Sequence, residues 1–158
     1  MLRGVELDGH GVYRDGHARA DHARAHAELA AEGGAEVRFE VADFARRAWP
    51  EQDVVTMFFP FLTAHACLAW GAPLSRLRPR RLLARAMAAV RPGGWLLVVD
   101  QTAAEHERLC ALLAGQPVEP VATASFASVR VPWADKTADQ VASLWRRQPG
   151  VPPRQSSR

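Results

Sequence analysis

The chain of 158 residues has little lysine and little cysteine. Lys136 is the only lysine, so the net charge of +3 comes almost entirely from arginine and indicates a composition bias rather than a polyanionic partner. The arginines of residues 76–81 lie in a connector that proline interrupts and that has no aromatic residues, which favours a solvated surface over a nucleic-acid site. The cysteines, Cys67 and Cys110, lie in apolar stretches with helical spacing, which predicts small buried side chains rather than a disulfide.

Long hydrophobic runs are also missing. No stretch of about 18 apolar residues is present, and no basic segment followed by an apolar one opens the sequence, so we expect neither a membrane span nor a secretory signal and place the protein in the cytoplasm. An apolar content of 48% in 158 residues is enough for one ordinary core. We therefore predict a single domain over residues 1–147 and a disordered polar tail over residues 148–158.

Apolar segments that are typical of strands alternate with segments of helical periodicity. Strands are predicted over residues 2–7, 36–42, 53–59, 95–100 and 118–131, and helices over residues 13–32, 62–70, 80–90, 102–114 and 137–147. The run at 53–59 is almost wholly apolar, which predicts a strand buried on both faces. Alternation at this spacing predicts an α/β fold with a doubly wound, mostly parallel sheet and an antiparallel strand near the C-terminus.

Three notable residues, Glu6, Asp43 and Pro60, fall at the carboxyl ends of predicted strands. In a parallel sheet these ends lie on one edge, where ligands bind. A carboxylate at such a place accepts two donors at once through its paired oxygens. The alternative for Glu6 is an exposed acid at a strand end, and for Asp43 a capping or turn acid.

Four motifs in this order resemble the class I S-adenosylmethionine-dependent methyltransferases from their second strand to their fifth. The motifs are Gly4-Val-Glu-Leu-Asp8, Phe39-Glu-Val-Ala-Asp-Phe44, Asp53-Val-Val55 and Val90-Arg-Pro-Gly-Gly-Trp-Leu-Leu-Val-Val-Asp100. The resemblance implies a Rossmann-like sheet, S-adenosylmethionine as cofactor, and methyl transfer as the activity.

The resemblance also implies roles for individual residues. Glu6 would accept hydrogen bonds from the ribose hydroxyls, Asp43 would accept the adenine amino group, and Phe44 would lie against the adenine ring. Phe59, after the fourth strand, would complete the cofactor-binding set. Relatives that methylate amino groups of nucleic acids carry an Asn/Asp-Pro-Pro-aromatic motif here, whereas this chain has Phe58 in place of the amide or acid. We therefore expect a small-molecule methyl acceptor and no nucleic-acid partner.

The histidines are the candidates for a general base and for metal ligands. His65 follows the fourth predicted strand and is the candidate general base, because imidazole titrates near neutral pH. His22 and His26 are four residues apart and share a helix face, but no third ligand is apparent from the spacing, so we expect no metal site.

The family's first strand and its glycine-rich loop have no counterpart, because the sequence given opens inside a strand. We expect an incomplete sheet, whose two strands beside the gap pair directly, dimerise or are unstable. Two other functions stay open. One is a non-catalytic scaffold that keeps the fold, and the other is a nicotinamide-dependent oxidoreductase, which shares the sheet and the acid after the second strand.

Overall fold

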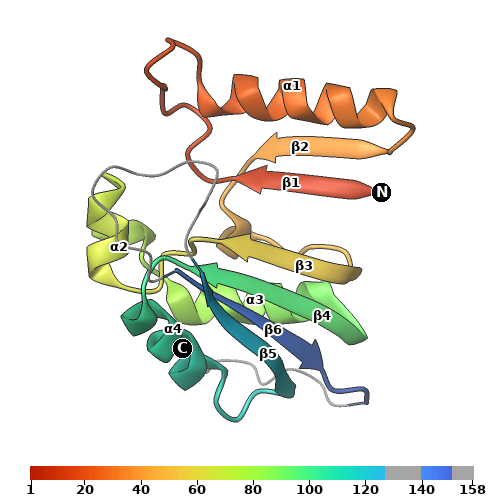
Figure 1. Ribbon diagram of the computed structural model, residues 1–158, viewed down its shortest axis with the longest axis vertical. Helices are drawn as coiled ribbons and strands as arrows, with labels where there is room; N and C mark the ends of the chain where they lie inside the picture. Colours follow the sequence, from red (N-terminus) through yellow and green to blue (C-terminus); the bar gives the residue numbers. More distant parts are fainter. Residues whose placement is uncertain (127–139, 151–158) are drawn as a thin grey trace. The chain divides into compact units, whose positions relative to one another are not determined.

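The computed structural model describes residues 1–126 and 140–150, and these form two compact units, Met1–Arg47 and Ala48–Arg158 (Figure 1). Each unit is described by itself. The predicted tail from residue 151 onward lies outside the described residues. The single domain over residues 1–147 stays a prediction.

The first unit contains two parallel strands and one long helix. β1 (Leu2–Glu6) pairs with β2 (Val37–Val41) in parallel, and Glu6 lies opposite Val41. α1 (Arg19–Glu32) runs alongside β2, and the 3₁₀ helix η1 (Phe44–Arg46) follows that strand (Figure 1). α1 starts later than the predicted residue 13 because a turn precedes it, in which the Gly16 N–H donates to the Tyr13 carbonyl and Gly16 has a φ of +85°.

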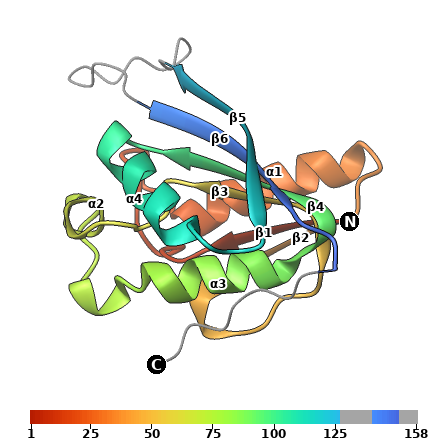
Figure 2. The same cartoon turned by 90° about the horizontal axis from the view of Figure 1, so that it is seen from below.

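The second unit is a four-stranded sheet with helices. Its elements in chain order are β3 (Gln52–Phe58), α2 (Ala64–Ala69), the 3₁₀ helix η2 (Leu74–Arg76), α3 (Pro79–Ala89), β4 (Val90–Asp100), α4 (Ala103–Leu113), β5 (Val118–Phe126) and β6 (Gln140–Arg147). The strand order is β3-β4-β6-β5, with β3 parallel to β4 and β6 antiparallel to both of its neighbours. α3 and α4 pack on each other and on β4 (Figure 2). The predicted α/β class and antiparallel strand near the C-terminus are thereby confirmed.

The predicted helix over residues 137–147 is wrong, because residues 140–147 form the strand β6. Val141, Ser143, Trp145 and Arg147 are buried, whereas the side chains between them are half-buried or exposed. This alternation has the period of two that a strand requires. Residues 137–139 lie outside the described residues, as does the predicted strand beyond Phe126.

β3 is not buried on both faces, which corrects a second prediction. Val55 is buried, but Val54 and Phe58 on the opposite face are 52% and 67% exposed. The core of the unit lies on the other side, between the sheet and α3 and α4, and its largest fully buried side chains include Met87, Leu96, Val98 and Leu109.

The two sheets are separate among the described residues. β1 is hydrogen-bonded to β2 in the first sheet, and β3 to β4 in the second. No helix among the described residues is long and apolar enough to span a bilayer, and the cytoplasmic location stays a prediction.

Candidate functional site

The carboxyl end of β1 places a half-buried acid beside a tight loop. Glu6 Oε1 accepts the backbone N–H of Asp8 at 2.9 Å, which holds the Glu6 carboxylate against the loop that leaves the strand. Gly9 follows and is buried. Asp8 itself is exposed, and its Oδ2 lies 3.4 Å from Arg19 Nη1.

The carboxyl end of β2 lies next to that of β1. The N–H of Ala42 donates to the Glu6 carbonyl at 2.9 Å, and Asp43 follows directly. Glu6 is opposite Val41 in the register, and Asp43 is two residues further along the chain, with an extended backbone. The structure therefore brings Glu6 and Asp43 to neighbouring strand ends, as the sequence predicts.

Asp43 also has the structural task that the alternative interpretation assigned to it. Its Oδ1 accepts the N–H of Ala45 at 3.0 Å and caps η1, while its Oδ2 lies 3.4 Å from Arg46 Nε. An ionised carboxylate has about four acceptor sites, so capping a turn does not by itself exclude contact with a ligand. Phe44 is half-buried and begins η1 next to this acid.

Gly9 is packed so closely that even a methyl group does not fit. A Cβ at this position would lie 2.3 Å from Cγ2 of Val41, whose branched side chain has little freedom to move. We expect Gly9→Ala to destabilise the first unit by about 1–3 kcal/mol, the usual range for overpacking. Thermal unfolding followed by far-ultraviolet circular dichroism measures this. The control is Gly33→Ala, where a Cβ meets its nearest atom at 3.4 Å, and equal effects for both variants would contradict the prediction.

In the second unit, the chain leaves β3 through a strained residue. Phe59 has a φ of +52°, which is rare for a bulky side chain and costs of order 1–3 kcal/mol, while its N–H donates to the Val99 carbonyl at 2.8 Å. Pro60 is buried directly after it. This backbone conformation sets the direction in which the half-buried Phe59 side chain leaves the backbone after β3.

The carboxyl end of β4 carries a buried acid that the sequence analysis did not select. Asp100 is fully buried, and its Oδ2 lies 3.2 Å from His106 Nδ1 on α4. Burial raises the pKa of Asp100 to about 6; contact with the His106 ring opposes this rise, and the charge of Glu105 adds to it. Glu105 is also buried, and its Oε2 accepts the N–H of Gln101 at 3.0 Å.

The same histidine reaches a thiol on the next turn of α4. Cys110 Sγ lies 3.5 Å from His106 Nε2, so Asp100, His106 and Cys110 form a chain of contacts. However, burial, followed by the nearby charge of Asp100, raises the pKa of the Cys110 thiol. The thiol therefore stays protonated at neutral pH, which opposes a role as nucleophile.

His65 lies apart from this chain of contacts. It is exposed near the start of α2, whose first turn is capped by the Thr63 hydroxyl oxygen. Near the buried cluster, Thr102 and Glu105 have the spacing of a helix capping box. Thr102 Oγ1 does accept the Glu105 N–H at 3.2 Å, but the Glu105 carboxylate binds the N–H of Gln101 rather than that of Thr102. The partnership of Asp100 with His106 had no signal in the spacing.

The sequence matches no protein-family model and no curated protein. Among solved structures, the chain is similar to the N-methyltransferase NodS from Bradyrhizobium japonicum WM9, in complex with S-adenosylhomocysteine, with 10% identity over 92% of this chain and 76% of that one and a TM-score of 0.56. It is likewise similar to the 1,6-didemethyltoxoflavin-N1-methyltransferase of Burkholderia thailandensis, with 15% identity, 93% and 71% coverage and a TM-score of 0.56.

The chain has the fold of the class I S-adenosylmethionine-dependent methyltransferases. The same fold also appears in the [4+2]-cyclase SpnF, at 14% identity over 94% of this chain and 75% of that one, with a TM-score of 0.56. This methyltransferase fold is thus shared by proteins with different reactions, so the reaction has to be argued from the site.

Proposed function

We propose that the protein binds S-adenosylmethionine and transfers its methyl group to a small-molecule acceptor. The observation that carries the proposal is the placement of Glu6 and Asp43 at the ends of two strands that pair in parallel. This is the edge of a parallel sheet at which ligands bind. The methyltransferase fold favours this cofactor over a nicotinamide dinucleotide.

The residues of the first unit suit the adenosine part of the cofactor. Glu6 is half-buried and presents a carboxylate, which is the acceptor that a pair of ribose hydroxyls requires. Asp43 can accept an amino group while it caps η1, and Phe44 beside it supplies apolar area for a purine ring. The family resemblance also assigns a cofactor-binding role to Phe59, and its positive φ is an outlier of the kind that is common at functional positions.

The chemistry demands little of the protein. The cofactor supplies an activated methyl group, so the main contribution of the chain is to orient the acceptor, an effect worth up to several kcal/mol. A general base is required only for an acceptor that ionises poorly. His65 stays the candidate for that role, since it is exposed to solvent after β3.

A small-molecule acceptor is supported by the end of β3. Phe58 is 67% exposed there and offers an apolar surface without the amide or acid that would hold an exocyclic amine. The toxoflavin-type enzyme, which shares the fold, is crystallised with a small heterocycle, 1,6-didemethyltoxoflavin.

Titration calorimetry with S-adenosylhomocysteine tests the cofactor proposal. We expect saturable binding to the wild-type chain and a loss of at least about tenfold in affinity for Glu6→Gln and for Asp43→Asn, because each removes a charged acceptor worth about 1.5–3 kcal/mol. Glu28→Gln, which changes an exposed acid on α1, is the matched control and is expected to bind like the wild type.

Three other outcomes would point to a different function or to a different site. The absence of saturable heat would favour the non-catalytic scaffold, whereas binding of a reduced nicotinamide cofactor, seen by its fluorescence, would favour the oxidoreductase. Equal binding by all three variants and the wild type would remove Glu6 and Asp43 from the site.

A further inference from the structure

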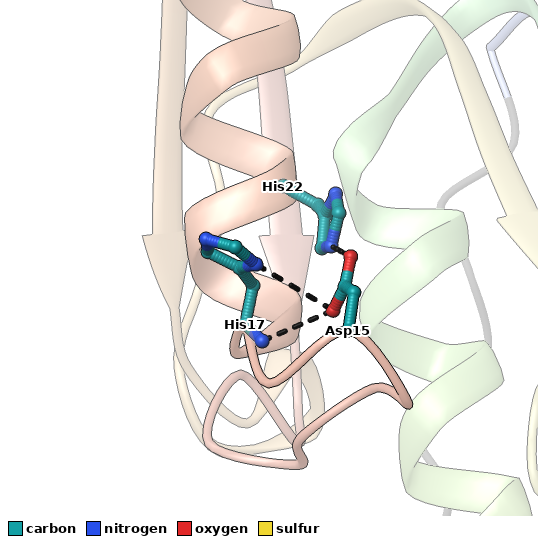
Figure 3. A group of neighbouring side chains, drawn as sticks. All are labelled: Asp15, His17 and His22. Carbon is teal, nitrogen blue, oxygen red and sulfur yellow. Dashed lines mark hydrogen bonds and ion pairs between the residues drawn. The ribbon is translucent and has the colours of Figure 1, made fainter.

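Four of the six histidines fall between residues 10 and 26, and the proposed cofactor roles use none of them. The fold gathers two of these, His17 and His22, around Asp15 (Figure 3). One ligand atom from each of the three side chains lies within 4.8 Å of the other two. Asp15 and His17 come from the loop before α1, and His22 comes from the first turns of that helix.

The contacts around Asp15 use both carboxylate oxygens. Oδ2 lies 2.8 Å from His22 Nε2, and Oδ1 lies 3.6 Å from His17 Nδ1. The two imidazoles lie edge to face with their centroids 5.7 Å apart. Two nitrogens and one oxygen at these separations can close on a tetrahedral ion, whose ligands sit about 2.0–2.2 Å from the metal, through small side-chain rotations.

Backbone hydrogen bonds hold this loop in place. The His17 N–H donates to Asp15 Oδ1 at 3.0 Å, and the Tyr13 N–H donates to the His17 carbonyl at 2.9 Å. The Tyr13 ring packs edge-on against His22, with centroids 5.2 Å apart. The ligands are therefore pre-organised before any ion arrives.

We propose that Asp15, His17 and His22 bind a divalent transition-metal ion such as Zn²⁺, with the fourth coordination position left to water or a small ligand. Two imidazoles and one carboxylate are donors of the kind that Zn²⁺ accepts, and three protein ligands with one open position are typical of zinc sites that react or exchange ligands. The three side chains are 48%, 66% and 42% exposed, so an ion reaches them without a change in the fold. The bound ion would fasten the loop to the start of α1.

Two other sites in the chain compete for the ion. The sequence offers His22 with His26, one helical turn apart on α1. The second unit offers His106 with Cys110, whose Nε2 and Sγ lie 3.5 Å apart. Asp100 contacts Nδ1 of His106 and Cys110 contacts Nε2, so these two groups lie at different nitrogens of the ring. Among the described residues, three ligand atoms come together only at Asp15, His17 and His22, which is why this cluster is favoured.

Calorimetric titration of the metal-free chain with Zn²⁺ tests the proposal, with Co²⁺ as a spectroscopic probe. We expect one equivalent to bind, visible absorption typical of four-coordinate Co²⁺, and an affinity at least about tenfold weaker in Asp15→Asn, His17→Ala and His22→Ala. The controls His26→Ala and Cys110→Ser are expected to bind like the wild type. Circular dichroism confirms that the five variants are folded.

Three results would overturn the site. Loss of binding in His26→Ala but not in His17→Ala would assign the ion to the helical pair, and loss in Cys110→Ser would assign it to the second unit. The third is the absence of saturable binding by the wild type. Because no S-adenosyl compound is present in the titration, none of these results bears on the proposed methyl transfer.

Discussion

Arg147→Ala is expected to destabilise the second unit by about 3 kcal/mol. Arg147 ends β6, is only 6% exposed, and donates from Nη1 to the carbonyls of Met87, at 3.2 Å, and Val90. Both carbonyls lie at the C-terminal end of α3, where a positive charge also complements the helix dipole. Truncation leaves these buried acceptors without their charged donor, and each such bond is worth roughly 1.5–3 kcal/mol. Part of this loss is offset, because Arg147 Nε has no hydrogen-bond partner in the folded chain and truncation removes the cost of burying it.

Urea unfolding followed by tryptophan fluorescence measures this change, because all five tryptophans lie between residues 48 and 158. The matched control is Arg146→Ala on the same strand. Arg146 is exposed and lies over the Trp95 ring at 5.5 Å, a contact worth about 0.5–1 kcal/mol. Arg147→Met fills the same space without donating, so it is expected to lose less stability than alanine but more than the control. A cost below that of Arg146→Ala would show that the buried guanidinium does not support α3.

The sequence predicts an element correctly where its local residue pattern and its packing in the folded chain favour the same secondary structure. The apolar strands, the end of α3 at Ala89 shortly before Pro92, and the capping residue Thr102 all have a physical cause within a few residues. β6 was predicted as a helix, although burial alternates along it and one of its buried positions carries the charged Arg147. That residue is satisfied by carbonyls 57 and 60 positions earlier in the chain, so only the folded chain shows why it is buried.

The same distinction applies to the candidate sites. The sequence predicts that Glu6 and Asp43 lie at neighbouring strand ends, because the carboxyl ends of parallel strands lie on one edge of a sheet. The parallel pairing of β1 with β2 agrees with this. The sequence did not predict that Asp15 and His17 lie near His22. The helix was predicted to begin at residue 13 and so to include Gly16, whereas Gly16 is part of a turn that precedes α1. The pairing of Asp100 with His106 depends on how α4 packs against the end of β4, which periodicity does not define.

Asp100→Asn is expected to raise the stability of the second unit at pH 8 and to change it little near pH 4. The pKa of Asp100 is about 6 in the folded chain against 3.8 for an ordinary aspartate, so between these values the folded state binds more protons than the unfolded state. The stability that this carboxyl contributes is therefore complete below pH 3.8 and is lost as the pH rises through 6. A shift of this size corresponds to about 3 kcal/mol, and an amide of the same shape never ionises.

The measurement is the difference in unfolding free energy between variant and wild type, taken at several pH values by urea titration, since other groups cancel in that difference. We expect it to grow from less than about 1 kcal/mol at pH 4 to about 2–3 kcal/mol at pH 8, with most of the change between pH 4 and pH 6. Asp53→Asn is the matched control. The Asp53 carboxylate is 78% exposed, so its replacement by an amide removes no buried charge and is expected not to produce this change with pH. A difference that is flat with pH, or a variant less stable than the wild type at pH 8, would show that His106 holds the Asp100 carboxylate ionised despite its burial.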